Sequence, residues 1–137
     1  MTFELVQLSF DKIMQTQSYT VIVLSAQEKR FAIYMDPNIG KTLQMFLTET
    51  ERPRPTTHDL LDKIFEGLEI QVKQIIINDV EDTVYFARLF LETEKNGLRY
   101  ILEIDSRPSD CLILALMNNA PVYCTREVLN KTIEVEE

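Results

Sequence analysis

The sequence is poor in the residues on which several common kinds of site depend. Glycine occurs only three times in 137 residues, and neither a glycine-rich dinucleotide-binding turn nor a GxxxxGK[ST] phosphate loop is present. The GxSxG and HExxH signatures of serine hydrolases and zinc proteases are missing as well. These absences exclude a Rossmann-like fold and the best-known nucleophile, phosphate-loop and zinc-protease sites.

Cysteine and long apolar runs are also scarce. Cys111 and Cys124 are the only cysteines, and each lies within an apolar run and outside any CxxC spacing, which favours buried, reduced thiols over a disulfide or a zinc site. No stretch approaches the roughly 20 apolar residues of a membrane span, and the N-terminal residues do not have the pattern of a signal peptide. We therefore expect a cytoplasmic protein with no membrane partner.

Basic residues are outnumbered. Lysine and arginine total 14 against 22 aspartates and glutamates, so the formal net charge is -8 at pH 7, and an acidic chain repels nucleic acid at long range. Apolar residues make up 45% and charged residues 26% of the chain, the profile of one ordinary globular domain. The net negative charge of this chain therefore disfavours binding to a nucleic acid.

What the sequence does contain is an internal repeat. The segment "RFAIYMDPNIGKTLQMFL" from Arg30 and the segment "RYILEIDSRPSDCLILAL" from Arg99 both read as a strand closed by an aspartate and followed by an apolar helix, and a hairpin pattern precedes each. This order predicts an α+β fold with an internally duplicated three-strand-plus-helix unit, and a mainly antiparallel sheet with helices packed on it. We expect one domain over 1–131, with repeats at about 3–50 and 70–120, and a polar tail over 132–137.

A proline-rich connection separates the repeats. Pro53 and Pro55 are expected to stop the first helix and to force an extended chain. Thr56 and Asp59 have capping-box spacing before a periodic apolar pattern, which predicts an amphipathic helix over about 57–68. After the second repeat, "PVYC" predicts a short buried strand and "TREVLNK" a short helix.

Polar side chains gather at two of the expected helix starts. His58 is the only histidine, so it is the simplest candidate for a general base. Composition alone favours the alternative, a solvated residue of a first helical turn. Arg107 next to free helix amides forms an anion site, and Asp105 can add a Mg²⁺ ligand. The first start holds Arg52, Arg54, His58 and Asp59, and the second holds Asp105, Arg107, Ser109 and Asp110.

These residues also have structural explanations. Pro108 and Asp110 suit the first turn of a helix, and Ser106 or Arg107 would be its N-cap. A buried arginine–carboxylate tie between the two loops would hold the halves of the domain together. The residue types alone leave catalysis and such a tie both open.

Three segments carry a resemblance to a known family. In chain order, "RPRPTTHDLL", "VKQIIINDVEDTVYFARLFLE" and "LEIDSRPSDCLILALMNNAPVYCTREVL" resemble the signature segments of the bifunctional nuclease (BFN) domain family, which occurs in bacteria and plants. The resemblance covers the chain from about Ile33 to Leu129. Plant members are described as nucleases acting on DNA and RNA, so the resemblance implies cleavage of phosphodiester bonds in DNA or RNA.

This activity, taken together with the residues of the two helix starts, gives a set of candidate site residues. Asp59, Asp105 or Asp110 would hold Mg²⁺ or Mn²⁺ to generate the nucleophile, Arg107 would stabilise charge in the transition state, and no organic cofactor is implied. The catalytic candidates are His58, Asp59, Asp105, Arg107 and Asp110, and the substrate-binding candidates are Arg52, Arg54, Thr57 and Ser109.

One position departs from the pattern of the family. Relatives usually show "IG..EA" before the proline-rich connection, whereas this chain has "IGKTLQ", with Leu43 and Gln44 at the Glu–Ala positions. If that glutamate is catalytic in the family, the departure implies weak activity or none. The alternative function is a non-catalytic interaction or regulatory domain that forms a homo-oligomer, with the motif residues acting as caps and ties.

Overall fold

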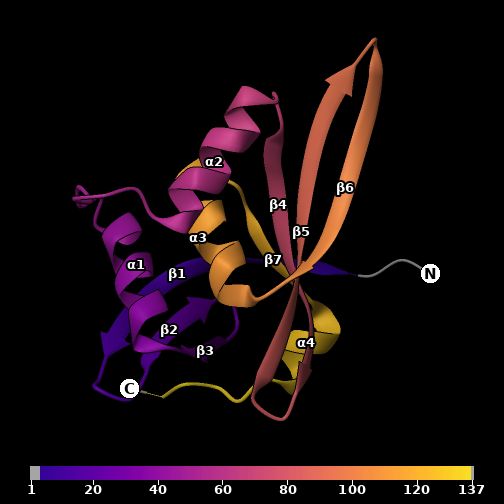
Figure 1. Ribbon diagram of the computed structural model, residues 1–137. Helices are drawn as coiled ribbons and strands as arrows, with labels where there is room; N and C mark the ends of the chain where they lie inside the picture. The colour runs from indigo at the N-terminus through magenta and orange to yellow at the C-terminus, as the bar shows by residue number, and fades with distance from the viewer. Residues whose placement is uncertain (1–3, 137) are drawn as a thin grey trace.

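The computed structural model describes residues 4–136 and contains seven strands and four helices (Figure 1). No helix in this range is long and apolar enough to cross a membrane. In chain order the elements are β1 (Leu5–Gln15), β2 (Thr20–Ser25), β3 (Arg30–Met35), α1 (Pro37–Leu47), α2 (Thr57–Gly67), β4 (Gln71–Glu81), β5 (Val84–Lys95), β6 (Leu98–Ser106), α3 (Pro108–Asn118), β7 (Val122–Thr125) and α4 (Arg126–Lys131).

The strands form one sheet in the order β3-β2-β1-β7-β4-β5-β6. Every neighbouring pair is antiparallel except β4 and β7, which run parallel. The short strand β7 therefore lies in the middle, with three strands of each half on either side. Both the α+β class and the mainly antiparallel sheet are confirmed.

The two halves follow the duplicated pattern. Strands β1 to β3 lead into α1, and strands β4 to β6 lead into α3, with the strand order reversed about β7. Phe31 and Tyr100 lie in the equivalent strands β3 and β6. The division into a domain over 1–131 and a tail stays a prediction, and the start of the first repeat and residue 137 lie outside the described residues.

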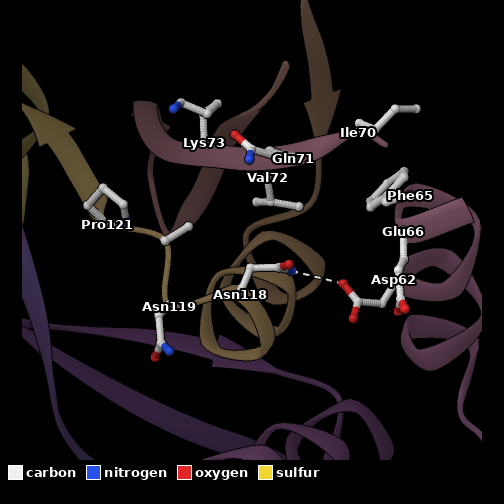
Figure 2. Close-up of a pocket in the computed structure, with 11 residues that line it drawn as sticks. Asp62, Phe65, Glu66, Ile70, Gln71, Val72, Lys73, Asn118, Asn119 and Pro121 are labelled. Atoms are coloured by element: carbon white, nitrogen blue, oxygen red, sulfur yellow. Dashed lines mark hydrogen bonds between the residues drawn. The ribbon is translucent and has the colours of Figure 1, made fainter. Parts of the chain in front are cut away.

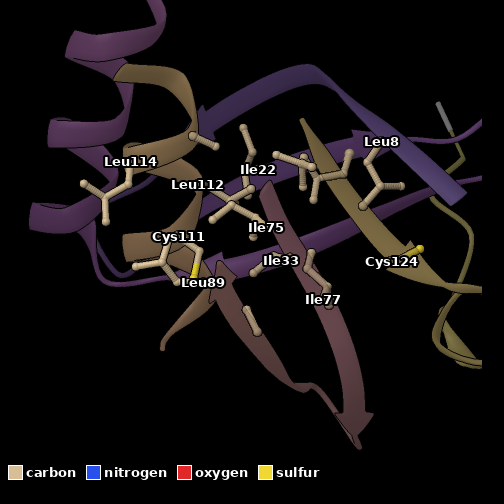
Figure 3. Close-up of a cluster of buried hydrophobic side chains, with 14 of the residues drawn as sticks. Leu8, Ile22, Ile33, Ile75, Ile77, Leu89, Cys111, Leu112, Leu114 and Cys124 are labelled. Carbon is tan, nitrogen blue, oxygen red and sulfur yellow. The ribbon is translucent and has the colours of Figure 1, made fainter. Parts of the chain in front are cut away.

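Helix α3 is the central helix of the core. It packs against α1, α2 and the sheet strands β4 and β5, and a helix that is apolar on nearly all sides must be covered in this way. Figure 3 shows its side chains beside buried residues of the sheet. Six of its residues are buried, namely Ser109, Cys111, Leu112, Ile113, Leu114 and Ala115.

Both thiols are buried, as the sequence predicts. Cys111 and Cys124 are fully buried free cysteines. Burial raises the pKa of the Cys111 thiol to about 12 and that of the Cys124 thiol to about 11, because a thiolate loses its hydration inside the protein. Both groups are therefore protonated and unreactive at neutral pH.

The expectation that prolines stop the first helix is wrong. Helix α1 ends at Leu47, before Pro53 is reached. The backbone N–H of Thr50 donates to the Met45 carbonyl at 2.9 Å, and Glu49 takes a left-handed φ of 53°, which is the Schellman way of ending a helix. The capping box of α2 is confirmed, because the Thr56 and Asp59 side chains each accept from the other residue's backbone N–H.

Candidate functional site

The first turns of α2 and α3 face each other. His58 is the second residue of α2 and Asp110 the third residue of α3. The two side chains meet with 2.8 Å between His58 Nε2 and Asp110 Oδ1. The structure thus joins one residue from each of the two motifs.

A cavity of about 940 Å³ opens beside this pair. Five of the candidate site residues line it, namely Thr57, His58, Asp105, Arg107 and Asp110. The rest of the wall is mostly apolar and comes from the helices and from one face of β5 and β6. The larger apolar residues are Ile39, Leu61, Phe65, Ile70, Leu89, Leu91, Leu102, Ile104 and Leu114.

His58 is buried, with 6% of its surface exposed, so its interpretation as a solvated residue is wrong. The reason is that the first turn of α2 is directed toward α3, where Asp110 supplies a partner for the ring. A buried polar side chain needs such a partner to offset the loss of water. In the neutral tautomer that donates from Nε2, the other ring nitrogen, Nδ1, is an acceptor.

Asp110 is the centre of the polar cluster. Its Oδ1 accepts from His58, and its Oδ2 accepts from Arg107 Nε and Nη2, each at 3.3 Å. The hydrogen bond from His58 and the charge of Arg107 hold the pKa of Asp110 below its ordinary value, although burial opposes them. The carboxylate is therefore ionised at neutral pH.

Arg107 and Asp105 are the accessible charges of the cavity. Arg107 is the N-cap of α3 but its side chain caps nothing, and the side chain is 72% exposed. Asp105 is also 72% exposed on its side chain and lies 3.7 Å from Arg88. Neither group is enclosed by the protein, so both are free to contact a ligand.

Asp59 serves the structure of its own loop. Its carboxylate accepts from Arg52 Nε at 2.9 Å and from the Thr56 backbone N–H at 2.7 Å. The bond from Arg52 is the largest cause of the strongly lowered pKa of Asp59. The Arg52 guanidinium also lies 4.2 Å from the centre of the Phe46 ring, a stabilising cation–π geometry.

The other residues predicted from the first motif lie apart from the cavity. Arg52, Arg54 and Asp59 line a separate surface hollow of about 470 Å³. From the second motif, Ser109 is buried in α3 and does not line the cavity. The structure therefore brings together His58, Thr57, Asp105, Arg107 and Asp110, and leaves Arg52, Arg54, Asp59 and Ser109 outside this group.

The expected tie between the loops takes a different form. Two of the motif arginines pair with a carboxylate of their own motif, Arg52 with Asp59 and Arg107 with Asp110. The link between the motifs is the His58–Asp110 hydrogen bond instead. The short separation along the chain explains this, since Arg52 reaches a carboxylate seven residues away and Arg107 one three residues away, without crossing to the other motif.

The position that departs from the family pattern faces the core. Leu43 is fully buried among apolar side chains of the hydrophobic core. The cavity is instead lined on α1 by Ile39 and Thr42. A carboxylate at position 43 of this backbone would therefore be buried away from the cavity.

The cavity offers few side-chain ligands for a divalent cation. Within residues 4–136, no group of three or more histidine, cysteine, aspartate or glutamate side chains gathers to hold a metal ion. Asp59 is engaged by Arg52 and lies outside the cavity, and both oxygens of Asp110 accept from His58 and Arg107, whereas Asp105 makes only a 3.7 Å contact with Arg88 among the described residues. A hydrated Mg²⁺ or Mn²⁺ can be held by a single carboxylate with its remaining oxygens from water and substrate phosphate, and Asp105 is the carboxylate of the cavity that could serve in this way.

The apolar wall is the part of the site that motif analysis missed. Leu89 and Leu91 of β5 lie opposite Ile104 and Leu102 of β6, and all four face the cavity. Their alternation in the sequence indicates one common face of a hairpin. It does not indicate that this face borders a cavity, because that depends on where α2 packs.

A second cavity lies at the other end of α2 (Figure 2). It measures about 490 Å³ and is lined by the last turns of α2 and α3 and by the start of β4. Asn118 donates to Asp62 across it at 3.0 Å. None of the predicted site residues lines this cavity, so it is distinct from the motif cluster.

Comparison with known proteins agrees with the motifs. The family model described as "Bifunctional nuclease domain" matches residues 21–137. Two curated relatives from two strains of Mycobacterium tuberculosis, "Uncharacterized protein MT1877" and "Uncharacterized protein Rv1829", are each 24% identical over 120 residues, covering 86% of this chain and 69% of the relative. The family match includes both motifs and most of the chain. This chain therefore belongs to the bifunctional nuclease domain family.

Proposed function

We propose that the chain is a nuclease that cleaves phosphodiester bonds of DNA or RNA in the cavity beside His58 and Asp110. The observation that carries the proposal is the 2.8 Å contact between His58 Nε2 and Asp110 Oδ1 at the wall of a cavity that also exposes Arg107 and Asp105. A histidine oriented by a carboxylate is a recurrent general base.

His58 moves the proton in the proposed reaction. Asp110 accepts the Nε2 hydrogen and fixes the ring, which leaves Nδ1 to take a proton from the attacking water. The oxygen of that water forms a bond to phosphorus, the bond from phosphorus to the leaving sugar oxygen breaks, and this oxygen takes a proton from solvent. Asp110 also stabilises the imidazolium that forms, since its carboxylate is ionised.

Arg107 binds the phosphate. Its exposed guanidinium stands at the N-terminus of α3, where helix amides also favour an anion. The planar guanidinium can donate two hydrogen bonds to phosphate oxygens and stabilise their charge as it grows. The Thr57 hydroxyl lines the same cavity and adds a neutral donor.

Asp105 would hold a hydrated Mg²⁺ or Mn²⁺ in this proposal, because both oxygens of Asp110 already accept hydrogen bonds from His58 and Arg107. Such an ion, when bound, supplies positive charge beside the phosphate oxygens. The chain is acidic overall, with a formal net charge of -8, so attraction for the polyanion has to come from Arg107 and this cation. We therefore expect weak long-range attraction and affinity that falls with added salt.

The proposal is tested by a cleavage assay on single- and double-stranded DNA and RNA with Mg²⁺ or Mn²⁺. His58→Gln should lower the rate by about a hundredfold or more, because general base catalysis supplies about that factor. Arg107→Ala should weaken substrate binding and cleavage together. A parent protein that cleaves none of the substrates, or a folded His58→Gln variant with the parental rate, contradicts the proposal.

Lys63→Ala is the matched control. Lys63 is an exposed cation paired with a carboxylate three residues away, as Arg107 is, but it lies outside the cavity. Its replacement should leave cleavage unchanged. Activity that survives equally in all variants would indicate a contaminating nuclease.

A second candidate function is favoured by the burial of His58. A histidine that is 6% exposed and bonded to Asp110 also suits a purely structural tie between α2 and α3, as in a non-catalytic interaction or regulatory domain. In that case Asp110→Asn would lower the unfolding temperature while the parent itself has no cleavage activity. The cleavage assay of the parent protein therefore separates the two functions.

A further inference from the structure

The two edges of the sheet differ in how well they are protected. The edge strand β3 has six residues, and the backbone N–H of Val135 donates to the Arg30 carbonyl at 2.9 Å, so the C-terminal segment covers part of it. The opposite edge strand β6 has nine residues, and residues 98–103 are all exposed. In Figure 1 the hairpin of β5 and β6 projects beyond the helices.

Strand β6 lacks several of the usual devices that keep an edge from pairing. Its sequence "LRYILEIDS" contains no proline and no lysine, and its pairing with β5 is continuous, without a bulge. Its exposed apolar residues are large, with Leu98 at 60%, Ile101 at 57% and Leu102 at 56% exposure. A long, regular, apolar edge of this kind is a template for another strand.

The order of residues in β6 is complementary to itself. When the strand is set antiparallel to a second copy with Ile101 facing Ile101, Arg99 faces Glu103 and Tyr100 faces Leu102. Residues directly opposite each other in an antiparallel pair point to the same face of the sheet. Two opposite-charge pairs therefore lie on one face, and the aromatic–aliphatic pairs lie on the other.

From these observations we propose that β6 is a homodimer interface, where two copies of this chain pair edge to edge about a two-fold axis at Ile101. The exposed charges suit this arrangement, since the side chains of Arg99 and Glu103 are 66% and 49% exposed. Each strand thus carries one exposed cation and one exposed anion between its apolar residues. The contact is locally neutral although each copy carries a net charge of -8. An isologous contact of this kind closes as a dimer.

The dimer also extends the wall of the cavity. Leu102 lines the cavity, and in the proposed pairing Tyr100 of the second copy stands next to it on the same face. The apolar face of the hairpin, which one copy leaves open to water, then continues into the second copy. The proposal concerns assembly alone and does not depend on whether the cavity cleaves nucleic acid.

The first test is the oligomeric state, measured by sedimentation equilibrium over a wide range of protein concentrations. The parent should be a dimer, and Ile101→Lys should raise the dissociation constant by about a hundredfold or more, because it sets like charges against each other at the axis. Val84→Lys is the matched control, since Val84 is 58% exposed on β5 but lies outside β6. A monomeric parent, or an Ile101→Lys variant that dimerises like the parent, overturns the proposal.

A charge exchange tests the register. Arg99→Glu alone and Glu103→Arg alone each set like charges opposite one another in a homodimer, so each variant should dimerise more weakly than the parent. An equal mixture of the two variants restores both opposite-charge pairs and should form a heterodimer. Each substitution also removes a bond within its own chain, Arg99 to Glu92 or Arg88 to Glu103, but this loss is the same in the homodimers and in the heterodimer. A mixture that associates as weakly as its two components alone therefore contradicts this register.

Discussion

The two repeats use the same strand-to-helix junction differently. In the first repeat Asp36 directly precedes Pro37, and its side chain accepts from the Asn38 backbone N–H at 2.8 Å to cap α1. In the second repeat two residues, Ser106 and Arg107, stand between the aspartate and the proline. The strand runs two residues further, the cap position passes to Arg107, and Asp105 is released from capping.

This difference shows how an aspartate that caps a helix in one repeat is left without a cap hydrogen bond in the other. Asp105 keeps its place near the end of the strand, but its side chain is 72% exposed at the cavity. The residue added at the cap, Arg107, brings a cation whose side chain caps nothing. The aspartate of the first junction therefore stabilises a helix, whereas the second junction leaves the charges of Asp105 and Arg107 available to a ligand.

The largest loss of stability is expected when a leucine is truncated in one of the helices that follow the junctions. Leu112→Ala in α3 should lower the free energy of unfolding by about 2–5 kcal/mol, because Leu112 is fully buried and its truncation leaves a cavity. Leu47→Ala in α1, at a partly buried position, should cost less. Urea unfolding of both variants checks this, and equal losses would show that the two helices contribute alike to the core.

Gly40 gives the next comparison, since Cys111 occupies the same place after the proline in α3. A Cβ on Gly40 would lie 1.9 Å from Thr20 Oγ1, so Gly40→Ala should lower stability by about 1–3 kcal/mol, the usual effect of overpacking. Adding Thr20→Gly should recover part of the loss. Thermal unfolding of the single and double variants measures this coupling, and a Gly40→Ala protein as stable as the parent would refute the tight contact.

The arginines of the two motifs should differ in stability. Arg52→Ala should cost about 1–2 kcal/mol, because it removes hydrogen bonds to the partly buried carboxylate of Asp59. Arg107→Ala should cost less than about 1 kcal/mol, since exposed ion pairs contribute little. Urea midpoints test the order, and a larger loss for Arg107 would mean that its pair with Asp110 is the structural tie.

Lowering the pH should reduce the stability of the fold through the aspartates of the same two motifs. The folded protein holds the pKa of Asp59 and of Asp110 below the ordinary value, which is about 3.9 in an unfolded chain. Their contribution to stability is thus fully present above about pH 5 and is lost as the pH falls through the unfolded and then the folded pKa. The Arg52→Ala variant should lose less stability than the parent on acidification, and urea midpoints across this range measure the difference.

The smallest effects are expected at the junction aspartates themselves. Asp36→Ala should lower stability by about 1 kcal/mol through loss of the helix cap. Asp105→Ala should change stability by less than about 0.5 kcal/mol, since its side chain is exposed. Thermal unfolding compares the two variants, and an equal loss at both positions would mean that Asp105 retains a structural role.

Local patterns predicted most of the fold. The duplicated strands, the capping box at Thr56 and the burial of Cys111 all follow from periodicity or from spacing of a few residues. The end of α1 was missed because it depends on a left-handed Glu49, a conformation for which glycine or asparagine is the usual signal. Strand order about β7 also has no local signal, since β7 pairs with residues far away in the chain.

The sequence shows where the two motifs of the site lie, but it does not show which of their residues meet at the cavity. Both helix starts are visible in the sequence, yet the pairing of His58 with Asp110 depends on how α2 docks on α3. Asp59 was grouped with the catalytic residues for its position in the motif, while the structure engages it in the capping box and with Arg52. A carboxylate with capping-box spacing already has local partners, and this is the signal that could have separated it from the cluster.

The placement of β7 has a consequence for the order of folding. This strand pairs antiparallel with β1 and parallel with β4, so the two halves of the sheet are joined by a strand that follows both of them in the chain. Until it is synthesised, β1 and β4 each have an unpaired edge, and closing the sheet requires contacts between distant parts of the chain, which form slowly. A nascent chain is therefore most open to mispairing with a neighbour after α3 has emerged from the ribosome and before β7 has inserted.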